Sequence, residues 1–188
     1  MPGLTALYVD FTDLRSYRAW RWLSLLPEHH AIEVRPFSLD SADGPPVRPW
    51  DRDTSSIGLE LLALGELARA AGRQCHHEYV DAAFAAVHEA ELDLGGVEAW
   101  LELSAEVGLD LDAFVDDGDR WRAEVGLWHA EAIDDLGIDD VPTLVVDDEH
   151  ALSVTLSRGV TGPLAARKLL DDLMDLIRYP VAAVRRHS

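Results

Sequence analysis

The stretch from Leu7 to Trp20 constrains the fold most, because an apolar run ends there and a helical pattern begins at once. Leu4 to Phe11 is β-branched and aromatic enough to form a buried strand. Asp13 follows as a helix N-cap, whose carboxylate accepts from a backbone N–H one turn ahead. A strand that passes directly into a helix leaves the first helical N–H groups unpaired beside the turn. We therefore expect any reactive group at this corner, in Asp13-Leu14-Arg15-Ser16.

The residues on either side of this corner predict a parallel pair of strands. The helix after Asp13 is expected to run to about Leu26, because Pro27 ends it. Ala31 to Phe37 predicts a second strand. Two strands joined by a helix form a βαβ unit with a right-handed crossover and parallel pairing. Residues 41–54 are rich in proline and predict a surface loop without regular structure.

The middle of the chain carries helical periodicity and lacks strand signals for roughly eighty residues. Glycines separate the predicted helices and act as stops. The predicted helices are Ile57 to Ala71, His76 to Leu92, Val97 to Val107, Leu111 to Val115 and Asp119 to Leu136. We interpret residues 55–138 as an all-helical insertion between two halves of a sheet.

The strand pattern returns near the end of the chain. Val141 to Val146 and Ala151 to Leu156 flank a polar turn, which predicts an antiparallel hairpin. A last helix is expected from Gly162-Pro163 to just before Pro180, followed by a basic tail, 181–188, that we expect to be frayed. The order of elements predicts an α/β thioredoxin-like fold. Residues 1–40 and 141–180 would form its main domain.

The cysteine count limits the chemistry of the chain. Cys75 is the only cysteine, so neither an intrachain disulfide nor a two-thiol redox centre can form. A cationic neighbour such as His76 or His77 would lower the pKa of a thiol and produce a reactive thiolate. We favour the alternative, in which Cys75 acts as a small buried hydrophobic residue.

The net charge and the hydropathy of the chain argue against nucleic acids and membranes as partners. A formal charge of -19 repels phosphate backbones and anionic membranes, so we expect no nucleic acid and no membrane as a partner. No apolar run approaches the roughly 20 residues that span a bilayer, and the start lacks a basic region followed by an apolar core. We expect a soluble cytoplasmic protein with a small-molecule ligand or a protein partner. The oligomeric state stays open, with a homodimer as one alternative.

Three segments carry a resemblance to a known family: Asp10 to Trp20, Tyr79 to His88, and Gly137 to Val146 with its Gly-x-x-x-Val-Pro-Thr pattern. They are similar to the strand-to-helix junction, the helical insertion and the proline segment of the DsbA-like branch of the thioredoxin superfamily. This branch includes dithiol oxidoreductases, 2-hydroxychromene-2-carboxylate isomerases and kappa-class glutathione transferases. The resemblance implies thiol–disulfide oxidoreductase activity in the family.

The Val-Pro-Thr segment carries a further implication of the resemblance. In the family the bond corresponding to Val141-Pro142 is cis, which would place the backbone of Val141 opposite the helix start, facing an extended ligand. Composition alone favours a trans proline that begins a strand, because only about 5–6% of X-Pro bonds in folded proteins are cis. The resemblance reverses this preference.

Two positions depart from the family pattern. Asp13 occupies the nucleophilic position, and a carboxylate cannot exchange disulfides. Nor can an ionised carboxylate, which the helix N-terminus favours, donate a hydrogen bond to a thiolate. Arg158 lies where isomerase and transferase relatives carry an acidic-basic pair that grips glutathione, yet it has no acidic neighbour in sequence. We predict no cofactor, with glutathione or another low-molecular-weight thiol as an open alternative.

The candidate site residues follow from the helix start and the segments expected to face it. Ser16 is the main catalytic candidate, because its hydroxyl could donate to a thiolate or to a developing oxyanion. The alternative is that Ser16 is a first-turn serine that helps to satisfy the backbone. Asp13 is the second catalytic candidate. The predicted ligand-binding residues are Arg15, Val141, Pro142, Trp50 and Arg158.

A metal site is the weakest of the candidate sites. His77, Asp81 and His88 share one helical face, and with one further ligand they could bind a metal ion. An ordinary polar helix face explains the same pattern, so we predict no metal.

Besides a metal-binding enzyme on the helical insertion, two functions are compatible with the sequence. In the first, the dithiol site has degenerated, and the cleft between Asp13-Ser16 and Val141-Pro142 binds a ligand or partner without redox turnover. The alternative is a serine-type isomerase or glutathione-transferase-like enzyme, in which Ser16 acts on a small anionic or thiol-conjugated substrate.

Overall fold

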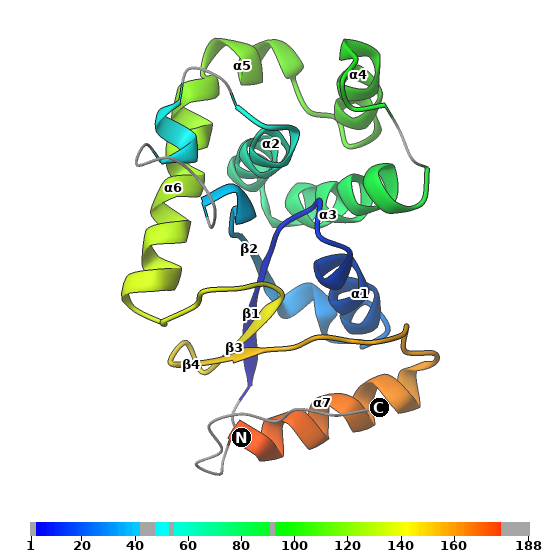
Figure 1. Cartoon of the computed structure of the whole chain (residues 1–188). Coiled ribbons are helices and arrows are strands. Elements are labelled where there is room, and N and C mark those ends of the chain that lie inside the picture. The colour runs from blue at the N-terminus through cyan, green and yellow to red at the C-terminus, as the bar shows by residue number, and fades with distance from the viewer. Residues whose placement is uncertain (1–2, 42–47, 53–54, 91–92, 178–188) are drawn as a thin grey trace.

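A four-stranded mixed sheet lies at the centre of the protein (Figure 1). The computed structural model describes residues 3–41, 48–52, 55–90 and 93–177. The strands are β1 (Leu4–Val9), β2 (Glu33–Pro36), β3 (Thr143–Val146) and β4 (His150–Ser153), in the order β2-β1-β3-β4. β1 pairs with β2 in parallel and with β3 antiparallel, and β3 pairs antiparallel with β4. This topology agrees with the predicted thioredoxin-like order.

The alternation of side chains along β1 divides the core between the two faces of the sheet. Leu7 and Val9 are fully buried and belong to the cluster that contains the buried faces of α1 (Leu14–Leu23) and α7 (Pro163–Ile177). Ala6 and Tyr8 point to the other face, where they pack with Ala132 of α6 (Gly118–Asp134). Because successive residues of a strand face opposite sides, one short strand supplies both halves of the core.

In its described residues, the predicted helical insertion contains five helices. They are α2 (Ile57–Ala71), α3 (Arg73–His88), α4 (Val97–Glu106), α5 (Leu111–Asp116) and α6. α2 packs against both α3 and α6, and Figure 1 shows the group above the sheet. The guanidinium groups of Arg35 and Arg69 both contact the ring of Trp128 of α6, with Cζ atoms 4.9 and 5.0 Å from its centroid. Since Arg35 belongs to β2 and Arg69 to α2, these contacts join the insertion to the sheet.

Most element boundaries differ from the predictions by a few residues. The largest shift is in α3, which begins at Arg73 rather than His76 and ends at His88 rather than Leu92. Gly72 adopts a φ of 133°, and this permits a sharp turn directly from α2 into α3. α1 ends at Leu23, three residues before the predicted end, and tight turns carry the chain to Leu26.

The loop predicted for residues 41–54 was partly wrong. Short 3₁₀ turns form at Leu39–Ser41 and Pro49–Asp51. In the second turn proline is favourable at the first position, and the N–H groups of Asp51 and Arg52 donate to the carbonyls of Arg48 and Pro49. Residues 42–47, 53–54 and the tail predicted for 181–188 lie outside the described residues. Within the described ranges, no helix is both long and apolar enough to cross a membrane.

Candidate functional site

The start of α1 is held by Asp13, as the sequence predicts. Its backbone is extended, and its carboxylate Oδ2 accepts hydrogen bonds from the backbone N–H and the hydroxyl of Ser16, both at 3.0 Å. A side-chain acceptor at this position satisfies first-turn N–H groups that have no helical partner. Asp13 is therefore committed to capping α1.

Arg15 connects this cap to the segment that precedes β3. Its Nε donates to Asp13 at 3.0 Å, and its two terminal nitrogens donate to the two carboxylate oxygens of Asp140 at 2.7 and 2.8 Å. Such two-pronged pairs have a geometry that a lysine cannot provide. The hydrogen bonds that Arg15 donates to Asp140 hold the pKa of Asp140 below its ordinary value and raise the pKa of Arg15. The helix start and the proline segment are thus fixed to each other.

The Val141-Pro142 peptide bond, on the other side of this ion pair, is cis. Both side chains are buried, so the backbone of this segment is what lies next to Asp140. The N–H of Val141 donates to Asp140 Oδ1 at 2.8 Å, and the carbonyl of Pro142 accepts from Val154 at 3.0 Å. A ligand that needs the N–H of Val141 would therefore have to displace Asp140.

Ser16 occupies a structural position. The residue is 0% exposed, its hydroxyl donates to Asp13 at 3.0 Å, and its oxygen accepts from the backbone N–H of Asp10 at 3.3 Å. A hydroxyl with both roles filled and no exposed surface cannot contact a ligand in this arrangement. The geometry favours the alternative in which Ser16 helps to satisfy the backbone, because its hydroxyl accepts from the N–H of Asp10 directly after β1.

Asp10 and Asp140 are two site residues that the sequence did not single out. Asp10 is 3% exposed, and its carboxylate accepts from the N–H and hydroxyl of Thr12 at 2.9 and 2.6 Å and from the N–H of Leu39 at 3.0 Å. Burial raises the pKa of Asp10. An acidic residue at the end of a buried strand was the signal for Asp10. The only sequence signal for Asp140 was its position directly before Val141-Pro142.

Besides Arg15 and Asp140, the exposed side chains at the start of α1 are those of Thr12 and Leu14. Leu14 is 47% exposed at the start of α1. The side chains of Arg15 and Asp140 are 34% and 46% exposed.

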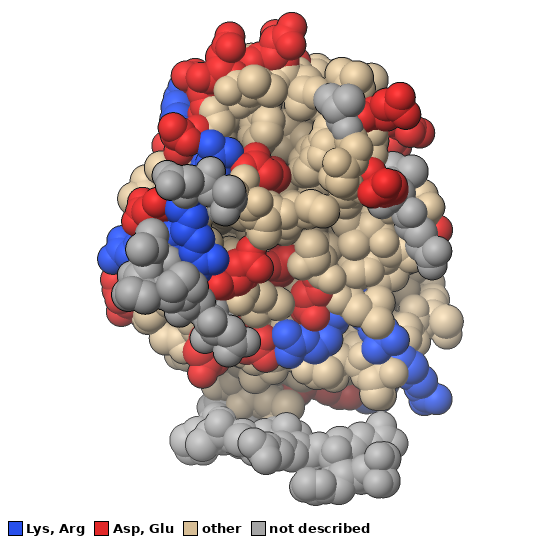
Figure 2. Space-filling model, turned by 45° about the horizontal axis from the view of Figure 1, so that its top comes forward, with Lys and Arg blue, Asp and Glu red and all other residues tan. Residues whose placement is uncertain are grey.

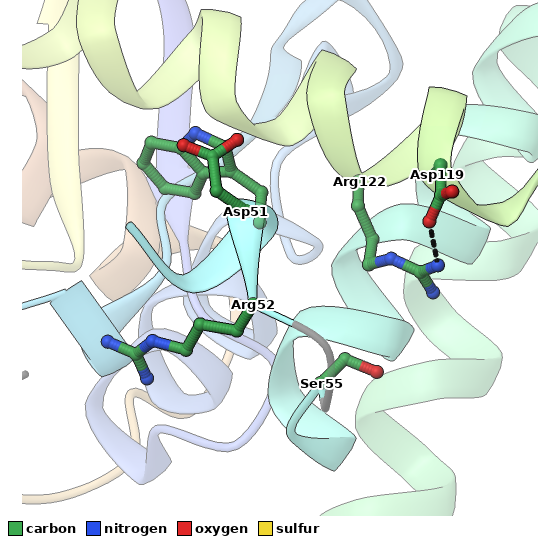
Figure 3. A pocket seen from close by; sticks show the side chains of 6 residues that line it. Asp51, Arg52, Ser55, Asp119 and Arg122 are labelled. Carbon is green, nitrogen blue, oxygen red and sulfur yellow. Dashed lines mark hydrogen bonds and ion pairs between the residues drawn. The ribbon is translucent and has the colours of Figure 1, made fainter. Parts of the chain in front are cut away.

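Trp50 packs on α6. A Cβ atom at Gly126 would lie only 2.7 Å from its Nε1, and its ring lies 5.1 Å from that of His129. Trp50 also lines a hollow of about 520 Å³ with Asp51, Arg52, Ser55, Asp119 and Arg122 (Figure 3). Figure 3 shows the guanidinium groups of Arg52 and Arg122 pointing in different directions, and Arg122 is paired with Asp119. The hollow therefore lacks a convergent anion site.

Arg158 lies on the exposed connection between β4 and α7. Within the described residues, no hydrogen bond or ion pair joins it to the Arg15–Asp140 pair. Its prediction as a ligand-binding residue stays a prediction.

Cys75 lies on α3, and burial raises the pKa of its thiol. Its Sγ is directed at the carbonyl of Val107, 3.7 Å away. The cysteine is half-buried rather than fully buried. A raised pKa disfavours the thiolate that disulfide exchange requires.

The three residues considered for a metal site have separate partners. Asp81 accepts from Trp20 at 2.6 Å, and the Nε2 of His88 lies 2.9 Å from the carbonyl of Phe11. His77 is 6% exposed and packs 5.7 Å from the Trp20 ring. No group of three or more potential ligands is arranged to hold a metal ion in the described part of the chain.

Comparison with known proteins identifies the architecture. No protein-family model matches the chain, and no curated protein matches it by sequence. Solved structures do match. A probable DsbA oxidoreductase from Streptomyces coelicolor superposes with a TM-score of 0.62 at 21% identity, over 95% of this chain and 92% of the other. The fold is DsbA-like.

Two further structures agree with this DsbA-like fold. The thiol-disulfide exchange protein α-DsbA2 from Wolbachia pipientis has a TM-score of 0.56 at 17% identity, and the match covers 89% of this chain and 80% of the other. A DsbA from Proteus mirabilis with a non-covalently bound peptide has a TM-score of 0.57 at 14% identity, covering 93% and 88%. The single cysteine separates this chain from any protein with a Cys-x-x-Cys pair.

Proposed function

We propose that this DsbA-like protein binds a small ligand or an extended segment of a partner in the cleft between Asp13-Ser16 and Val141-Pro142, without thiol–disulfide exchange. The Arg15–Asp140 ion pair carries the proposal, because it joins the two sides of the cleft through side chains that stay partly exposed. Asp13 fills the place of a reacting group but serves as a helix cap. The site therefore offers polar recognition and lacks a nucleophilic sulfur.

The proposal that Ser16 acts as the catalytic residue of an isomerase or transferase has less support. Ser16 is buried and its hydroxyl is engaged on both sides. An enzyme of that kind requires a hydroxyl aimed at the substrate. We therefore keep binding as the proposed function and assign Ser16 to the support of the site.

The surface charge supports small molecules or proteins as ligands over nucleic acids. The formal charge is -19, and Figure 2 shows acidic atoms spread widely over one face, with basic atoms gathered at its left edge and along its lower part. Phosphate backbones bind basic surfaces, because cationic side chains release condensed counterions. A cytoplasmic location and the absence of a membrane partner stay predictions.

The redox half of the proposal is tested by insulin reduction with dithiothreitol. We expect the purified protein to leave the rate at the background of dithiothreitol alone, while a dithiol thioredoxin accelerates it. Cys75→Ser should match the wild type. A rate above background that survives Cys75→Ser but disappears in Asp13→Ala would contradict the proposal.

The binding half is tested with the peptide bound in the Proteus mirabilis structure, Pro-Trp-Ala-Thr-Cys-Asp-Ser. We expect this chain to bind it and a variant with serine in place of cysteine equally well, because no sulfur chemistry is involved. Asp140→Ala frees the N–H of Val141 and should strengthen binding severalfold. Calorimetry measures both effects, and a requirement for the cysteine would overturn a non-redox site.

A further inference from the structure

A separate hollow lies between α1 and α3, further along α1 than the cleft. Its volume is about 580 Å³, within the range of small-molecule sites. Figure 1 shows the two helices side by side, and they are in contact. All of its lining residues lie within the described ranges.

The floor of this α1–α3 groove is apolar. Trp20 and Phe84 line the groove and are each only 1% exposed. Ala82 and Ala85 of α3 add short side chains that leave room above the helix, and Val107 extends the floor beyond α4. This floor suits the methylene groups of a ligand, since burying apolar surface is favourable.

The rim of the groove is acidic. Glu78, Asp81 and Glu89 come from α3 and its end, and Glu106 comes from α4. At about 1.5 Å and 100° per residue, Glu78 and Glu89 lie roughly 16 Å apart along one face of the helix. Arg21 is the one lysine or arginine among the described residues that line the groove, and it lies 3.9 Å from Glu89. The carboxylates thus form a row with few cations to balance it.

Aromatic donors fix two of these carboxylates in place. Asp81 accepts from the indole N–H of Trp20 at 2.6 Å, and Glu89 accepts from the hydroxyl of Tyr17 at 2.8 Å. A carboxylate has several acceptor sites, so each retains capacity for a cation. The row is therefore held beside the apolar floor before any ligand arrives.

We propose that the α1–α3 groove binds a linear aliphatic polyamine. Such a ligand carries ammonium groups along a methylene chain, which matches charges spaced over roughly 16 Å above an apolar floor. The acidic rim favours a cationic ligand, and the volume of the groove favours a small molecule. The proposal is independent of any activity in the cleft.

Spermidine is the probe for this proposal, measured by calorimetry on the full chain at 50 and 150 mM salt. We expect one spermidine per chain, with affinity that falls at the higher salt concentration because exposed charges are screened. Glu78→Gln combined with Glu89→Gln should weaken binding at least tenfold. Asp171→Asn combined with Asp175→Asn removes the same charge from α7 and should change affinity less than twofold. Thermal unfolding of both variants verifies that they fold.

Three outcomes would overturn the proposal. The first is an absence of heat with the wild type at millimolar spermidine. The second is equal weakening in both double variants, which would indicate general attraction to an acidic protein. The third is several spermidine molecules bound per chain with no preferred site.

Discussion

The cleft at the start of α1 and the α1–α3 groove use charge in opposite ways. In the cleft, Arg15 is matched internally by Asp13 and Asp140, so the ion pairs are satisfied without a ligand. In the groove, Glu89 faces a loosely placed Arg21 at 3.9 Å, and the other carboxylates of the rim have no lysine or arginine beside them in the lining. The comparison shows that the charged side chains of the cleft stabilise one another, so that a ligand would have to displace Asp140. The carboxylates of the groove, in contrast, remain available to a cation from solution.

The largest expected effect is that of acid on the stability of the whole protein. It sets the pH range in which the cleft and the groove can be compared. Burial lowers the pKa of His76 to about 3 and that of His129 to about 4. A histidine with a lowered folded-state pKa gives stability that is present above about pH 6.5 and lost as the pH falls toward the folded value.

We therefore expect the free energy of unfolding to drop by several kcal/mol between pH 7 and pH 4. Urea unfolding at intervals of half a pH unit measures this. His129→Phe should flatten part of the slope, and an unchanged slope in that variant would contradict the assignment. The raised pKa of the buried Asp10 acts in the opposite direction and offsets a part of the loss.

Removing one hydroxyl from each region gives the next largest difference. Ser16→Ala deletes two buried hydrogen-bond roles and should cost about 1–2 kcal/mol. Tyr17→Phe deletes one exposed hydrogen bond to Glu89 and should cost less than about 0.5 kcal/mol. Chemical denaturation measures both. Equal costs would mean that Ser16 is not the structural support described for the cleft.

The two ion pairs should differ by a smaller amount. A double-mutant cycle of Arg15→Met and Asp140→Asn should give a coupling of about 1 kcal/mol, because the pair is two-pronged and partly shielded. The same cycle with Arg21→Met and Glu89→Gln should give about 0–0.3 kcal/mol, because both side chains are at least 48% exposed. Coupling of similar size in both would remove the distinction between the regions.

Much of the fold was predictable from local patterns. The strand-to-helix corner, the helical stretch and the hairpin each follow from apolar spacing and turn residues, and their order predicts the thioredoxin arrangement. Asp13 was predictable as a cap because capping depends on neighbours in sequence. Boundaries such as the start of α3 depended on the backbone angle of Gly72 and were less predictable.

The arrangement of the cleft was less predictable, because it depends on contacts between distant residues. Arg15 and Asp140 are 125 residues apart, and no local pattern indicates their pairing. The burial of Ser16 depends on packing beneath α1. Trp50 packs on α6 because Gly126 has no side chain to occupy the same space. The residue types indicate which chemistry is possible, whereas tertiary packing determines which of these groups are accessible.

A map of backbone amide shifts during titration with the heptapeptide tests the account most directly. The measurement is a ¹H–¹⁵N spectrum of the full chain at pH 7, recorded with increasing Pro-Trp-Ala-Thr-Cys-Asp-Ser. The account predicts that the amides of Leu14, Arg15 and Val141 move together and saturably, while those of Ala82 and Ala85 stay in place. Shifts confined to the α1–α3 groove, or no shifts at all, would contradict a ligand-binding cleft at the start of α1.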